Sequence, residues 1–260
     1  GLYVWGRRDP AARWFCTRFA IGLAFGAVLW LVSLWIPAPA RYSLWALALL
    51  VEMGTPFIVS LNLTGRIYYV SHIPERLGVF TLIVLGEAIV QVGAGLVGTH
   101  WQIFSVLTAI GSFVIAACLW WIYFDRIDSA VIDRALTRGK QEMVRSFSWS
   151  YIHLVLYAGL TAASVGIARA IAVSPGRLDN GARIALCVGI AVALFAISLI
   201  QQLSPHHLPR SELIIRLAAS IAALLLALFG MGLSSLAIVG LLMLLLVTVT
   251  VFEVARFEHY

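Results

Sequence analysis

Charged residues are scarce in this sequence, at 12% of 260 residues, whereas hydrophobic residues make up 62%. A soluble domain is about a quarter charged and about half apolar, so this chain has too few charges to solvate the surface of such a fold. The hydrophobic residues also occur in blocks of about twenty, the length that a helix needs to cross the hydrocarbon core of a bilayer. The composition therefore argues against an ordinary soluble domain and predicts an integral membrane protein.

Several motifs that would indicate chemistry are also missing. The sequence has no P-loop, no Gly-x-Ser-x-Gly and no His-Glu-x-x-His, and its three cysteines form no CxxC pair. No block of five or six like charges occurs, so the formal charge of +6 does not indicate nucleic-acid binding. We predict no enzymatic activity, no cofactor and no metal site. An intramembrane hydrolase or acyltransferase that uses His153 and a carboxylate is a minor alternative.

The apolar blocks predict about eight transmembrane helices, because a segment of this length must satisfy its own backbone hydrogen bonds in lipid. We expect an all-α, polytopic helical bundle that forms a single transmembrane domain over residues 1–260. The chain opens with Gly1 and not with Met, which suggests a piece of a longer protein. The predicted spans are 16–36, 42–62, 77–97, 101–124, 147–172, 181–203, 211–231 and 233–253.

The orientation follows from the Lys and Arg residues on alternate sides of these spans. Fourteen lie on one side and four on the other. Loops rich in Lys and Arg stay in the cytoplasm, so both ends of the chain are predicted to be cytoplasmic. An error in one helix would mix the two counts, so their separation also supports eight spans. The expected location is the bacterial cytoplasmic (inner) membrane, with multiple passes.

Two carboxylates, Glu52 and Glu87, stand near the middle of predicted spans, where a charge costs about 2.5–3.5 kcal/mol on insertion scales. Each could hold two helices together as a protonated or hydrogen-bonded carboxyl group. For Glu87 we favour a functional role, because Gln91 follows one turn later on the same face. Gly86 and Gly93 flank this face and could allow another backbone to approach closely.

The fifth span carries a polar stripe that should face protein or water and not lipid. Ser150, His153 and Tyr157 are its central members. The imidazole of His153 is either a hydrogen-bonded packing group or a proton relay. Further polar residues are expected at the cytoplasmic mouths of the third and fourth spans, namely His72, Glu75, Arg76, Asp125, Arg126 and Asp128.

These groups combine into one hypothesis: a polar vestibule that opens to the cytoplasm and ends at Glu87, with His153 along it. The hypothesis requires the third, fourth and fifth spans to be neighbours. Glu52 is a secondary candidate for the polar pathway.

Three segments carry a family resemblance. They are His72-Ile-Pro-Glu-Arg-Leu-Gly-Val-Phe-Thr-Leu-Ile-Val-Leu-Gly-Glu87, Trp121-Ile-Tyr-Phe-Asp-Arg126 and Ser150-Tyr-Ile-His153. In this order and spacing they resemble the bacterial low-temperature-requirement A (LtrA) family of membrane proteins. The family's name records a cold-growth phenotype and not a reaction. Its members usually have further helices upstream, so the resemblance implies that the chain begins partway along.

Together, the residues and the resemblance predict a proton- or cation-linked transporter or channel-like protein with a cytoplasm-facing pathway to Glu87. A non-transporting membrane sensor or scaffold linked to cold or stress adaptation is the alternative. The expected partners are membrane lipids and an unknown small ion or solute, and the protein could form a homo-oligomer.

Overall fold

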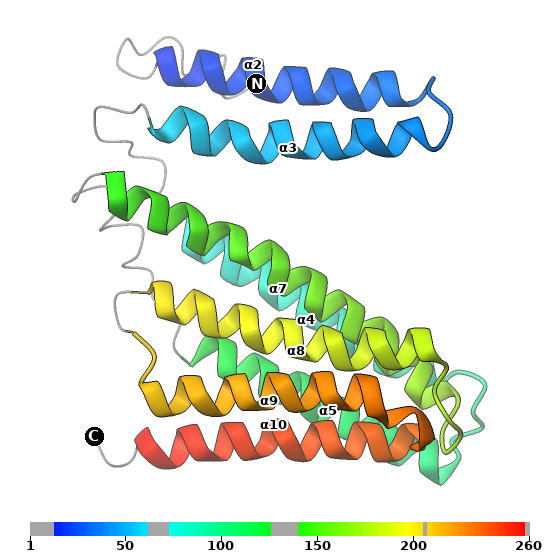
Figure 1. Cartoon of the computed structure of the whole chain (residues 1–260). Coiled ribbons are helices and arrows are strands. Elements are labelled where there is room, and N and C mark those ends of the chain that lie inside the picture. Colours follow the sequence, from blue (N-terminus) through cyan, green and yellow to red (C-terminus); the bar gives the residue numbers. More distant parts are fainter. Residues whose placement is uncertain (1–12, 62–72, 126–139, 205–206, 258–260) are drawn as a thin grey trace. The chain divides into compact units, whose positions relative to one another are not determined.

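The computed structural model describes residues 13–61, 73–125, 140–204 and 207–257, and these residues form helices without any strand (Figure 1). Eight helices in this described part are long and apolar enough to cross a membrane, which confirms the all-α fold and the eight predicted spans. Which side of the membrane each end occupies stays a prediction. The helices are α2 (Arg13–Ser33), α3 (Ala40–Leu61), α4 (Ile73–Leu96), α5 (Ile103–Phe124), α7 (Lys140–Ala172), α8 (Asn180–Leu203), α9 (Arg210–Phe229) and α10 (Ser235–Phe257), with a short 3-10 turn at Gly230–Gly232.

Two helices begin four or more residues before their apolar blocks. Helix α4 starts at Ile73, where Pro74 suits the first turn and Glu75 favours the positive end of the helix dipole. Helix α7 starts at Lys140, seven residues before the predicted span, and is 33 residues long. Its first turns are polar, so hydropathy alone placed them in a loop. Side-chain capping marks the start of α8, where Asp179 accepts a hydrogen bond from the Ala182 amide at 3.0 Å.

The helices group into two compact units. Unit 1 contains α2, α3 and the first residues of α7, up to Phe147. Helices α2 and α3 pack along each other, and the indole of Trp30 donates to Glu52 Oε1 at 3.0 Å. Gly26 makes room for this carboxylate, since a Cβ on Gly26 would lie 2.6 Å from Glu52 Cγ. Within unit 1, Glu52 therefore bonds one transmembrane helix to the next.

Unit 2 contains α4, α5, the rest of α7 and α8–α10. Helix α9 packs against α8 and α10, and α5 packs against α4 and α10. Helices α7 and α8 approach backbone to backbone at Gly159 and Gly189: a Cβ on Gly189 would lie 2.5 Å from the Ala163 nitrogen and 2.7 Å from the Gly159 oxygen. Small residues permit such approach between membrane helices.

The close helix contacts of unit 2 occur at other glycines than those that the sequence predicted. A Cβ on Gly86 or Gly93 would meet no described atom of unit 2 within 4 Å. The expectation of a close helix approach at these two glycines is therefore wrong within this unit. The period of α4 had placed both on one flank, but the sequence does not say which flank of a helix meets its neighbour.

We expect Gly189→Ala to lower the stability of the folded protein by about 1–3 kcal/mol, because its methyl group would overlap the backbone of α7. Thermal unfolding in detergent micelles measures the effect. Gly93→Ala is the matched control and should leave the melting temperature unchanged or slightly raised, since the added methyl group meets nothing and Ala favours helix. Equal losses in the two variants would contradict the backbone contact between α7 and α8.

Candidate functional site

Glu87 lies on the exposed side of α4 within unit 2. The buried positions of α4 are Pro74, Gly78, Thr81, Leu85, Ala88 and Gly95, and the helical period places Glu87 nearly opposite that stripe. The amide of Gln91 donates to Glu87 Oε1 at 2.5 Å. Among the described residues, no Lys, Arg or His pairs with this carboxylate. Glu87 and Gln91 therefore form the predicted polar pair on a largely apolar helix surface.

A hollow of about 390 Å³ lies on the same side of α4, one turn before Glu87. Glu75 and Arg76 line its end near the helix start, and Val79, Phe80 and Ile83 line the remainder. Ile83 precedes Glu87 by four residues and so shares its face. The structure therefore brings Glu75 and Arg76 into line with Glu87 along one helix.

His153 lies in a different environment. It belongs to α7, is fully buried in unit 2 and faces Tyr123 of α5. Its Nδ1 is 2.8 Å from the Trp149 carbonyl oxygen and its Nε2 is 3.1 Å from the Tyr123 hydroxyl. A carbonyl oxygen only accepts, so Nδ1 carries the proton and Nε2 accepts from Tyr123. The rings of Trp149, Tyr123 and Tyr157 surround the imidazole, with centroids 4.6, 6.0 and 6.1 Å away.

Tyr157 connects this group to α4. Its hydroxyl donates to the Leu77 carbonyl oxygen at 3.0 Å and lies 3.4 Å from the Thr81 hydroxyl. Thr81 belongs to the buried stripe of α4, but the Tyr157 ring also packs edge-on against Phe80, with ring centroids 4.8 Å apart, and Phe80 lies on the side of α4 that carries Glu87. The third, fourth and fifth spans are thus neighbours, as the vestibule hypothesis requires. The described hydrogen bonds, however, do not join Glu87 to His153.

The remaining predicted residues fall into three groups. Ser150 is half-buried on α7, and Asp125 is exposed at the end of α5, where its amide donates to the Trp121 carbonyl oxygen at 2.9 Å. Glu52 lies in unit 1, bonded to Trp30. His72, Arg126 and Asp128 lie outside the described residues.

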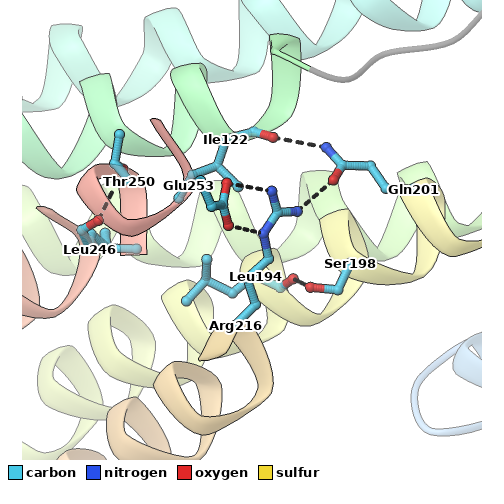
Figure 2. Close-up of polar contacts among 8 residues, drawn as sticks. All are labelled: Ile122, Leu194, Ser198, Gln201, Arg216, Leu246, Thr250 and Glu253. Carbon is cyan, nitrogen blue, oxygen red and sulfur yellow. Dashed lines mark hydrogen bonds and ion pairs between the residues drawn. The ribbon is translucent and has the colours of Figure 1, made fainter. Parts of the chain in front are cut away.

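A buried ion pair that the sequence reasoning missed joins α9 to α10 (Figure 2). Arg216 Nε donates to Glu253 Oε1 at 2.5 Å and Nη2 donates to Oε2 at 2.7 Å, while Nη1 donates to Gln201 Oε1 at 2.6 Å. The Gln201 amide nitrogen donates in turn to the Ile122 carbonyl oxygen at 2.8 Å. Arg216, Glu253 and Gln201 are 0%, 1% and 2% exposed. Four helices therefore meet in one polar network.

A signal for this pair was present in the sequence. Arg216 is the seventh residue of α9, and Glu253 is the fifth from the end of α10. Consecutive spans run in opposite directions, so these opposite charges stand at similar depth. The count of basic residues treats Arg216 only as one more positive charge, and hydropathy describes both spans only as apolar.

We expect Glu253→Leu to destabilise the protein by about 3–5 kcal/mol, because it leaves the Arg216 guanidinium buried without its counter-ion. The double variant Arg216→Met/Glu253→Leu should regain most of this loss, since apolar side chains of similar size replace both charges. Thermal unfolding of the single and double variants measures both effects. A double variant that is no more stable than Glu253→Leu would contradict an energetic role for the pair.

Comparison with known proteins supports the resemblance noted from the motifs. The family model of bacterial low temperature requirement A protein (LtrA) matches residues 1–251. A Rhizobium meliloti (strain 1021) protein that is described as uncharacterized is 27% identical over 184 residues. The match covers 64% of this chain and 42% of that relative, so the chain spans less than half of its length. No solved structure matches.

Proposed function

The chain belongs to the bacterial low temperature requirement A family of membrane proteins, and we propose that it moves protons or small cations along the Glu87 side of α4. The observation that carries this proposal is the position of Glu87, a carboxylate in the middle of a membrane-length helix with no cationic partner among the described residues. A carboxylate at this depth is costly when it faces lipid, so protein or water must cover it.

The chemistry of this surface favours a positive substrate. Glu87 offers carboxylate oxygens, and the Gln91 amide orients one of them. Glu75 and Arg76 at the hollow would receive the ion from the predicted cytoplasmic side, and the apolar wall of Val79, Phe80 and Ile83 would lead it toward Glu87. This route uses one face of α4 and does not pass His153.

His153 is better suited to holding helices in place than to relaying protons. Both ring nitrogens already have partners, and a second proton on Nε2 would remove the acceptor of the Tyr123 hydrogen bond. The His153 group, through Tyr157, holds α4 at the Leu77 carbonyl oxygen and at the Phe80 ring. We therefore assign His153 a supporting role, in which it keeps α4 positioned while ions pass Glu87.

Glu87→Gln should reduce proton or cation flux at least about tenfold, because the amide cannot bind a cation or exchange a proton as the carboxylate does. Flux is measured in proteoliposomes with an imposed pH or ion gradient and a pH-sensitive or ion-sensitive dye. Asp179→Asn is the matched control: the same chemical change on an exposed carboxylate outside the spans should leave flux unchanged.

The same variants separate transport from the alternative of a sensor or scaffold. A scaffold should tolerate Glu87→Gln and should lose function when the backbone contact between α7 and α8 is disrupted by Gly189→Ala. Undiminished flux in Glu87→Gln, or the absence of any gradient-driven flux in the native protein, would refute the proposed function.

A further inference from the structure

The orientation of the Gln201 amide is fixed by its two partners. The guanidinium of Arg216 can only donate hydrogen bonds, and the carbonyl of Ile122 can only accept them. Gln201 must therefore direct Oε1 toward Arg216 and its NH₂ group toward Ile122, as Figure 2 shows. A reversed amide would oppose donor to donor on one side and acceptor to acceptor on the other.

Arg216 is itself held in one orientation. The two carboxylate oxygens of Glu253 accept hydrogen bonds from Nε and Nη2 of Arg216, which fixes the plane of the guanidinium. Its remaining nitrogen, Nη1, is then directed at Gln201. From Glu253 through Arg216 to Gln201, only one arrangement of donors and acceptors allows every hydrogen bond to form.

This network ends on the last turn of α5. Ile122 is among the last four residues of that helix, whose carbonyl groups lack the usual intrahelical partner. The Trp121 carbonyl oxygen accepts a hydrogen bond from the Asp125 backbone amide, and the Ile122 carbonyl oxygen accepts one from the Gln201 side-chain amide. The next residue, Tyr123, is buried and donates its hydroxyl proton to His153. Two consecutive residues of α5 thus belong to two different polar networks.

We propose that Arg216 and Gln201 are positioning residues for His153. By holding the Ile122 carbonyl, Gln201 fixes the last turn of α5 and keeps the Tyr123 hydroxyl at hydrogen-bonding distance from His153 Nε2. Arg216 fixes the direction of the Gln201 amide and so controls its role as a donor. Rearrangement of the ion pair on α9 and α10 is therefore transmitted to the imidazole on α7. This link from Arg216 to His153 does not involve Glu87 and does not depend on transport.

Nitrogen NMR of the purified full chain, labelled with ¹⁵N-histidine in detergent micelles, reads the state of the imidazole directly. The resonances of His153 are identified by their loss in His153→Gln. Tyr123→Phe removes the donor to Nε2 and gives the reference shift for a broken hydrogen bond. We expect Gln201→Met to shift the Nε2 resonance toward that reference.

Gln202→Met is the matched control, because Gln202 is the next residue of α8 and bonds to the Leu208 carbonyl oxygen instead. It should leave the His153 resonances in place. The double variant Arg216→Met/Glu253→Leu removes both charges without leaving either one unpaired, so it keeps the fold while it frees the Gln201 amide to rotate. It should shift Nε2 in the same direction as Gln201→Met.

The double variant also keeps the test decisive if Gln201→Met does not fold. Native His153 resonances in a folded double variant, or in a folded Gln201→Met protein, would overturn the proposal. The network would then stabilise the helices without positioning the imidazole.

Discussion

A charged side chain that is buried among membrane helices needs partners within the protein, and the polar networks of unit 2 follow this constraint. The guanidinium of Arg216 satisfies it through Glu253 and Gln201, on two other helices. The imidazole of His153 satisfies it through the Tyr123 hydroxyl and the Trp149 carbonyl. Since the partners come from α5, α8 and α10, satisfying these few groups also fixes which helices are neighbours.

Close packing complements these bonds. The helix pair α7 and α8 meets at Gly159 and Gly189, where the backbones themselves are in contact. The Arg216 and His153 networks lie near one end of unit 2, whereas the glycine contacts lie further along α7 and α8. Helix α8 takes part in both, through Gly189 and Gln201, so it joins the packed region to the polar network. Glu87 takes part in neither the glycine contact nor the Arg216 network.

Much of the fold could be predicted from the sequence, because length and hydropathy define a membrane helix almost completely. Pro74 and Glu75 even indicated how α4 begins. Contacts between helices were harder to predict. Glu87 and His153 looked like members of one pathway because they lie on neighbouring spans, but their described hydrogen bonds go to different partners and do not connect them. Predicting the ion pair between Arg216 and Glu253 requires a comparison of the depths at which α9 and α10 carry their charges. Hydropathy does not measure these depths.

The ion pair between Arg216 and Glu253 also determines how unit 2 responds to the electric field across the membrane. A single elementary charge that crosses the full membrane potential exchanges about 2.3 kcal/mol per 100 mV with the field. The pair carries no net charge, so moving α9 and α10 together couples very little of that energy to their motion. Glu87 has no charged partner among the described residues, so an ion bound there, as the proposed function requires, would enter the field as a single charge. Under the proposed function, membrane voltage would therefore act on the ion at Glu87 and would do little work on this buried ion pair.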